Sequence, residues 1–176
     1  MNQTYSLYAH HNNDRSWNDR SYLRIYQIDT VDSFWKIMNT IDHDNICSSF
    51  QLFLMKNKIK PKWEDPENKS GGCWSYKIKY KNKEDIHDAF VKISIGFICN
   101  TLLREKNNNI NGINIIVKQQ HFIIKLWLKT MTKTLPLSQY IISVLGEKTI
   151  QRGISQIHKS NIKRDFRKKT FYQYKK

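Results

Sequence analysis

The 176-residue chain carries 30 lysine and arginine residues against 15 aspartate and glutamate residues, a formal net charge of +15, and 39% of it is hydrophobic. This length and apolar content suit one globular domain and exclude a wholly disordered chain. No apolar run approaches the roughly 18 residues of a membrane-spanning helix, and the start lacks the pattern of a secretory signal. The cysteines Cys47, Cys73 and Cys99 show no Cys-x-x-Cys spacing, so we expect reduced thiols, no metal site and a cytosolic or nuclear protein. Of these two locations we predict the cytoplasm, which would be the host cytoplasm for a viral protein.

The positive charge indicates a polyanionic partner, because a basic surface attracts nucleic acid or phosphate over about a Debye length. Part of the excess lies at the C-terminus, where His158 to Lys176 holds eight lysine and arginine residues and one acid, Asp165. A solvated tail without a binding role is the alternative. The abundance of Lys, Asn and Ile also suits an A/T-rich genome, such as that of a large DNA virus or a divergent protist.

Hydrophobic periodicity predicts strands and helices that alternate along the chain. In chain order we expect a strand at 5–8, a strand at 22–28, a helix capped at Asp29 or Thr30 and running to Ile41, strand 73–80, helix 84–104, strands 112–118 and 121–129, helix 135–146, and strand-like pieces at 154–159 and 170–174. Hairpins mixed with separate helices are typical of α+β proteins. We predict a curved, mostly antiparallel sheet of about eight strands with three helices packed on its convex face. One domain would span 1–176 and include a basic C-terminal segment, 158–176.

The loop Ile59-Lys-Pro-Lys-Trp-Glu-Asp-Pro-Glu-Asn-Lys-Ser-Gly-Gly-Cys-Trp74 projects Trp63 beside two carboxylates, Glu64 and Asp65. The acids are unexpected in so basic a chain, and a tryptophan in a polar loop bounded by Pro and Gly is poorly placed to join the core. The loop therefore predicts a stacking surface for a flat ligand. The alternative is a tryptophan that folds back onto the sheet.

This loop closely resembles the signature of the translation initiation factor 4E family, the messenger-RNA cap-binding proteins. The shared positions are Pro61, Trp63, Glu64, Asp65, Asn68, Gly71, Gly72 and Trp74. Asp29-Thr-Val-Asp-Ser-Phe-Trp35 is similar to the family's Thr-Val-x-x-Phe-Trp helix start, and Trp17 sits where the family has its other cap-stacking tryptophan. The resemblance is close over about 5–129 and looser beyond.

The resemblance implies that a 7-methylguanine base lies between Trp17 and Trp63. Glu64 would accept hydrogen bonds from the guanine edge, and Trp127 would contact the N7-methyl group. Trp127 also reads as a strand residue that faces the core, and Trp74 is better explained as core than as ligand.

At the cap triphosphate the chain departs from the family pattern. The family's arginine before Trp74 is Cys73 here, its hairpin arginine is Lys118, and a further family lysine is replaced by Ile123. We expect phosphate or RNA contacts from the residues Lys118, Lys125, Lys159, Lys163 and Arg164. For the last three, the alternative is that they are ordinary solvated side chains without a binding role.

A second surface is implied for a protein partner, either a scaffold similar to factor 4G or a repressor with a Tyr-x-x-x-x-Leu helix. The matching residues are Val31, Trp35, Val91 and Ile95. Lys92 stands where relatives carry a glutamate, and the family's His-Pro-Leu segment before the first strand has no counterpart. We therefore predict an initiation factor that recruits capped messages; the alternatives are a cap-binding repressor or competitor and a general single-stranded RNA binder.

An enzyme is not predicted, since we find no glycine-rich cofactor loop, metal-ligand cluster or nucleophile–base pair, and we expect no cofactor. The histidines His10, His11 and His43 are interpreted as surface polar residues.

Overall fold

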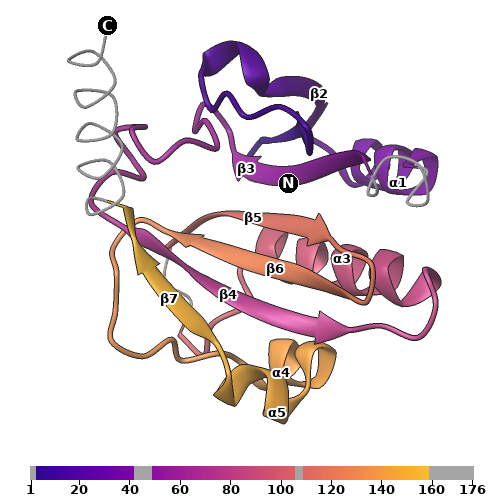
Figure 1. Cartoon of the computed structure of the whole chain (residues 1–176), viewed down its shortest axis with the longest axis vertical. Coiled ribbons are helices and arrows are strands. Elements are labelled where there is room, and N and C mark those ends of the chain that lie inside the picture. The colour runs from indigo at the N-terminus through magenta and orange to yellow at the C-terminus, as the bar shows by residue number, and fades with distance from the viewer. Residues whose placement is uncertain (1–2, 42–48, 106–108, 159–176) are drawn as a thin grey trace, which may run out of the picture.

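A curved antiparallel sheet of seven strands, in the order β2-β1-β3-β5-β6-β4-β7, organises the computed structural model, which describes residues 3–41, 49–105 and 109–158 (Figure 1). The strands are β1 (Tyr5–His11), β2 (Leu23–Ile28), β3 (Phe50–Lys56), β4 (Gly72–Lys79), β5 (Ile110–Val117), β6 (His121–Leu128) and β7 (Ile154–Ile157). Every pair of neighbouring strands is antiparallel. Strands β2 and β7 stand at the two ends of the order and form the open edges of the sheet. The α+β class and the antiparallel sheet are thus confirmed.

Four α-helices lie in the described part of the chain, one more than the three predicted. They are α1 (Val31–Thr40), α3 (Glu84–Ile98), α4 (Gln139–Leu145) and α5 (Glu147–Gln151), with a 3-10 turn, η1 (Asp19–Ser21), before β2. The additional helix is α5, a five-residue helix that starts directly after α4. Gly146, at a φ of 80°, ends α4 and turns the chain into α5.

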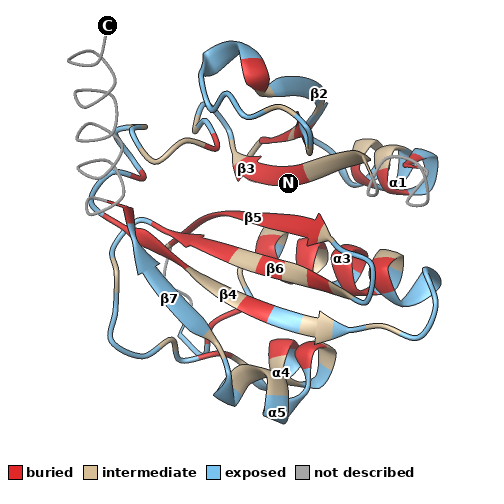
Figure 2. Ribbon diagram, viewed as in Figure 1, coloured by how far each residue is buried: buried red, intermediate tan, exposed pale blue. Residues whose placement is uncertain are grey.

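The helices cover one face of the sheet because each contributes its apolar stripe to a common core (Figure 2). Phe34 and Met38 of α1, Phe90 of α3 and Phe122 and Ile124 of β6 are all buried members of this core. Trp74 also packs against this core, as expected. The opposite face of the sheet keeps a separate, smaller cluster, which forms the candidate site.

The predicted helix caps are observed, but one helix is shorter than expected. The Thr30 hydroxyl accepts a hydrogen bond from the Ser33 backbone N–H, and Ser33 in turn caps the Thr30 N–H, forming a capping box at the start of α1. Helix α3 ends at Ile98, short of the predicted end at 104, because Asn100 takes a left-handed conformation with φ of 55°. None of the described helices has the length and apolar character required to cross a bilayer.

Strand β3 was not predicted, and its burial explains why. Leu52, Phe53, Leu54 and Met55 are all buried, because β3 lies in the middle of the sheet between β1 and β5 with side chains packed on both faces. A strand buried on both faces reads as a continuous apolar run, and period alone does not separate it from a buried helix. The predicted strand at 170–174 lies outside the described residues.

The paired glycines at the start of β4 are required by a close approach of three backbones. A Cβ atom on Gly71 would lie 1.8 Å from the Leu128 carbonyl oxygen at the end of β6. A Cβ atom on Gly72 would lie 2.3 Å from the Gln156 carbonyl oxygen of β7. The glycines let β6 and β7 flank β4 where the Trp63 loop enters the sheet.

Candidate nucleic-acid interface

The face of the sheet opposite the helices carries an aromatic cluster that we call the concave-face cluster. Its buried members are Phe53 and Met55 of β3 and Trp127 of β6. Partly buried side chains pack against them: Tyr8, Tyr22, Ile59 and Trp63. Trp127 is 4% exposed and its indole nitrogen Nε1 has no hydrogen-bond partner among the described residues. The cluster therefore joins two sequence-predicted site residues, Trp63 and Trp127, at one place.

The Trp63 loop, which runs from 57 to 71, is held by side chains of the family signature. Asn68 is fully buried, and its amide nitrogen donates to the carbonyl oxygens of Lys60 and Lys62, both at 2.9 Å. Its amide oxygen accepts a hydrogen bond from Asn111 of β5 at 3.1 Å. Asp65 accepts hydrogen bonds from the backbone N–H groups of Lys60 and Glu67. These hydrogen bonds pair backbone groups on both sides of Trp63 and fix the conformation of the loop. The loop therefore holds the Trp63 side chain in a defined position.

The Trp17 loop, between β1 and β2, is supported mainly by a histidine. The His10 ring is fully buried and stacks on the Trp17 indole, with centroids 4.0 Å apart and planes 5° apart. His10 Nε2 lies 3.1 Å from the Ser16 carbonyl oxygen. Because His10 covers one face of the indole while Trp17 remains 51% exposed, the other face is available to a ligand. The interpretation of His10 as a surface polar residue was wrong.

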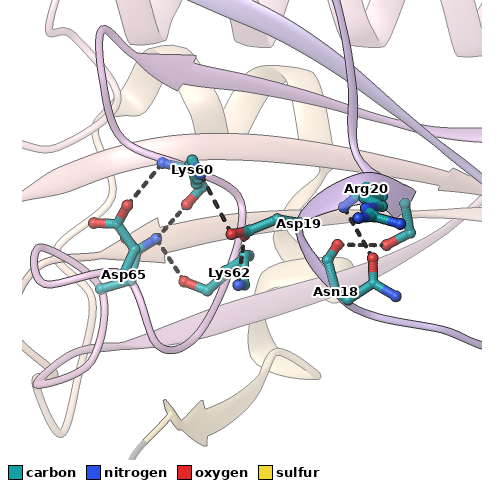
Figure 3. Close-up of polar contacts among 8 residues, drawn as sticks. Asn18, Asp19, Arg20, Lys60, Lys62 and Asp65 are labelled. Atoms are coloured by element: carbon teal, nitrogen blue, oxygen red, sulfur yellow. Dashed lines mark hydrogen bonds and ion pairs between the residues drawn. The ribbon is translucent and has the colours of Figure 1, made fainter.

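Ion pairs join the two tryptophan-bearing loops (Figure 3). Asp19, in η1, accepts a hydrogen bond from Lys62 Nζ at 2.6 Å, and Lys60 Nζ lies 3.6 Å from the same carboxylate. The hydrogen bond from Lys62, then the charges of Lys62 and Lys60, lower the pKa of Asp19. The link thus holds at neutral pH and is lost only as the pH falls through that lowered pKa. It connects the segment after Trp17 to the segment before Trp63.

Substituting Asp19→Asn is expected to loosen both loops without unfolding the sheet. Exposed ion pairs are weak because water screens them, so amide hydrogen exchange in 12–22 and 57–71 should accelerate by no more than about fivefold. The melting temperature should change little. Asp32→Asn, an exposed acid on α1, is the matched control; equal exchange in both variants would contradict the link.

Glu64 is exposed, directly follows Trp63, and its charge acts on two side chains near the concave-face cluster. Burial, followed by the Glu64 charge, raises the pKa of Tyr22. The same carboxylate acts on His158 in the direction that raises its pKa. The Glu64 carboxylate is therefore within electrostatic range of Tyr22, whose ring centroid is 6.1 Å from that of Trp17, and of His158, which contacts Trp127.

His158 closes the site, and sequence reasoning did not identify it. Its ring centroid lies 4.8 Å from Trp127 and 6.3 Å from Trp63, nearly parallel to the latter at 22°. Nδ1 is 2.9 Å from the Asn68 carbonyl oxygen, which places a proton on Nδ1 and leaves Nε2 as an acceptor. Burial and then the Lys125 charge lower the pKa of His158 against opposing contributions from Asn68 and Glu64. His158 is therefore neutral at pH 7.

The phosphate residues predicted from the sequence are placed only in part. Lys125 points from β6 to the concave face and is partly buried, whereas Lys118 is exposed in the β5–β6 turn. Lys159, Lys163 and Arg164 lie outside the described residues.

The predicted partner surface is mixed in its exposure. Val31 and Trp35 of α1 are 62% and 44% exposed, so both are available to a partner. Ile95 of α3 is half-buried, and Val91 is 8% exposed and contributes mainly to the core. Lys92 pairs with Asp88 one turn earlier, at 3.6 Å.

Fold and site together define an open antiparallel sheet with helices on one face and, on the other, an aromatic site built from two linked loops. The family model described as "Eukaryotic initiation factor 4E" matches residues 1–173. The chain belongs to the eukaryotic initiation factor 4E family. This family consists of initiation factors rather than enzymes, in agreement with the prediction that the chain is not an enzyme.

Curated relatives are eukaryotic translation initiation factor 4E proteins. That of Eremothecium gossypii is 35% identical over 130 residues, covering 72% of this chain and 58% of the relative. That of Saccharomyces cerevisiae is 30% identical over 122 residues, covering 67% and 54%. The chain thus spans somewhat more than half the length of the curated relatives it matches.

Solved structures share the fold at low identity. A complex of C. elegans eIF4E-3 with the 4E-binding protein Mextli has a TM-score of 0.70 at 18% identity, covering 92% of this chain and 94% of that one. A complex of Ascaris suum eIF4E-3 with m7G cap has a TM-score of 0.65 at 22% identity, covering 76% and 74%. The predicted sheet with helices on one face is the fold of these proteins.

Proposed function

We propose that the chain binds the 7-methylguanosine cap of messenger RNA and serves in translation initiation as one domain that spans residues 1–176. One observation carries the proposal. Two loops linked through Asp19 present Trp17 and Trp63 at the rim of the concave-face cluster, and the exposed carboxylate of Glu64, the residue after Trp63, is within electrostatic range of Tyr22 and His158. Aromatic faces beside an acceptor-only group suit a flat, positively charged base with donors on its edge.

The base would lie between Trp17 and Trp63. Stacking on an aromatic side chain contributes about 1–3 kcal/mol per base. N7-methylation gives guanine a positive charge, and a cation over an aromatic face adds about 0.5–2 kcal/mol. Because His10 already stacks behind Trp17, the indole is held ready and costs little further ordering on binding.

The edge of the base would be read by Glu64. The N1–H and exocyclic amine of guanine are both donors, and a carboxylate accepts two charge-assisted hydrogen bonds. Adenine presents an acceptor at N1 and would leave the carboxylate partly unpaired. Trp127, buried in the floor of the cluster, would contact the N7-methyl group.

The phosphates would meet lysines and arginines. Lys125 is suited to this role, since its charge acts on both Cys73 and His158 at the wall of the site. The proposal includes Lys118 and also Lys159, Lys163 and Arg164, each as a point charge or a guanidinium fork for RNA phosphate.

Recruitment would use the opposite side of the molecule, in the cytoplasm. Val31 and Trp35 are exposed apolar residues one helical turn apart on α1, and they suit the apolar face of a partner helix. Ile95 and the small exposed part of Val91 would extend the surface onto α3. The partner would be a scaffold similar to factor 4G or a binding protein with a Tyr-x-x-x-x-Leu helix.

Glu64→Gln tests the cap site most specifically. Removing the charge should weaken binding of 7-methylguanosine triphosphate by roughly 10- to 100-fold, since hydrogen bonds to charged groups contribute about 1.5–3 kcal/mol. Tryptophan fluorescence titration measures the change. Glu67→Gln is the matched control, because Glu67 lies in the same loop but pairs with Lys129 at 2.9 Å.

Equal weakening in the two variants would contradict a specific role for Glu64. A wild-type protein that binds capped and uncapped RNA alike, with steep salt dependence, would support a general single-stranded RNA binder instead. Cap binding without scaffold-peptide binding would support a protein that sequesters capped messages.

A further inference from the structure

The β4–β6 ladder carries a row of positive charge along the concave face, leading away from the cluster. Alternate residues of a strand share one face, and directly opposite residues of an antiparallel pair point to the same side. Four cross-strand pairs therefore lie beside one another on this face: Cys73–Trp127, Ser75–Lys125, Lys77–Ile123 and Lys79–His121. The row begins at Trp127, in the proposed cap site, and becomes increasingly basic toward the β5–β6 turn.

The two apolar positions in this row, Cys73 and Ile123, are those at which the family pattern has an arginine and a lysine. Cys73 is 2% exposed and carries no charge for a phosphate. Ile123, however, lies directly opposite Lys77, with Cβ atoms of such a pair about 4.5–5.5 Å apart. The exposed lysine can lay its stem over the isoleucine and bring its ammonium group to the same region.

Lys125 likewise lies across the ladder from a position at which the family's basic side chain is missing, Cys73. Its direct partner is Ser75, which makes Cys73 its diagonal neighbour across the ladder. Burial raises the pKa of the Cys73 thiol, and the Lys125 charge opposes that rise. The ammonium of Lys125 is thus close to the place where the family's arginine would be.

Among the described residues, no carboxylate pairs with these lysines. In the part of the chain that the structure describes, no ion pair to an acid forms at Lys77, Lys79, Lys118 or Lys125. Burial, then the charges of Lys77 and Lys118, lower the pKa of His121 at the end of the row. Like charges that converge on one face without a counter-ion favour an anionic ligand there.

We propose that Lys77 and Lys125 bind the cap triphosphate from across the β4–β6 ladder, in place of the basic side chains missing at Ile123 and Cys73. The phosphates then run along β6 from Trp127 toward the β5–β6 turn, where Lys118 and Lys79 meet the following RNA phosphates. This assignment rests on the proposed cap site.

The test moves one charge across the ladder. Lys77→Ala should weaken binding of 7-methylguanosine triphosphate by roughly five- to tenfold and leave the monophosphate nearly unaffected. Adding Ile123→Lys to Lys77→Ala should restore most of the lost affinity, because it returns the charge to the opposite side of the same pair. Lys36→Ala, an exposed lysine of α1 on the other side of the molecule, is the matched control.

Several results would overturn the assignment: no loss with Lys77→Ala, an equal loss for mono- and triphosphate, or no recovery with Ile123→Lys. Guanosine triphosphate and monophosphate, titrated in parallel, separate this proposal from that of the cap site. If the protein shows no preference for the methylated base, cap binding fails, but a Lys77-dependent gain from the added phosphates still supports the phosphate site.

Discussion

Trp63→Ala is expected to reduce affinity for 7-methylguanosine triphosphate by about 100-fold. The substitution removes a stacking surface worth about 1–3 kcal/mol and a cation–aromatic contact worth about 0.5–2 kcal/mol. Because Trp63 is only partly buried at the rim of the concave-face cluster, the sheet should remain folded. Isothermal titration calorimetry measures the loss independently of the tryptophan signal.

A graded series separates stacking from loop collapse. Trp63→Phe keeps an aromatic face and should lose much less affinity than Trp63→Ala. Trp74→Phe, a tryptophan of the helix-side core in the adjacent strand, should leave the cap affinity unchanged. A Trp63→Ala variant that binds as well as Trp74→Phe would mean that Trp63 does not stack on the base.

Trp35→Ala is expected to reduce affinity for a peptide with the Tyr-x-x-x-x-Leu pattern by at least about 30-fold. Tryptophans at the centre of interfaces commonly contribute 2 kcal/mol or more to binding. Trp35 is 44% exposed on α1, and its ring packs edge-on against Phe34 at 5.2 Å, which holds it in place for a partner helix. Fluorescence polarisation of a labelled peptide measures the change.

The control for Trp35→Ala is Ile154→Ala. Ile154 is 69% exposed on β7, at the opposite edge of the sheet, so its removal should not affect the peptide. Neither variant should alter affinity for 7-methylguanosine triphosphate. A similar loss of peptide affinity in both would indicate non-specific apolar binding rather than a site on α1.

Strand β6 shows how a strand could be predicted from its residues, because one of its faces is toward the helices and the other is more polar. β6 buries Phe122, Ile124 and Leu126 against the helices while His121 and Lys125 face the other side, so its alternation is visible in the sequence. β3 shows no such alternation because both of its faces are covered. Its burial depends on neighbours that are distant in the chain, and no local pattern records that.

The Trp63 loop could be recognised from its residues, but the reason for its shape could not. Asn68 is a polar residue among polar residues in the sequence, yet it is fully buried and bonded to both sides of the loop and to β5. The link from Asp19 to Lys62 likewise joins segments far apart in the chain. Such contacts follow from tertiary packing rather than local propensity.

Two histidines show the same limit at the site itself. His10 was interpreted as a surface residue, and His158 was counted as the first residue of a basic tail. Both are fully buried, and each lies against a tryptophan of the proposed site. No local pattern predicts this burial, since the contacts come from Trp17 and Trp127 on other segments.

The most direct test of the proposed function is the ratio of affinities of the full chain for 7-methylguanosine triphosphate and for guanosine triphosphate, followed by tryptophan fluorescence at fixed salt. The methyl group adds a positive charge between two indoles, so we expect the methylated ligand to bind at least tenfold more tightly, the equivalent of about 1.4 kcal/mol. Equal affinities would contradict recognition of the cap by Trp17 and Trp63.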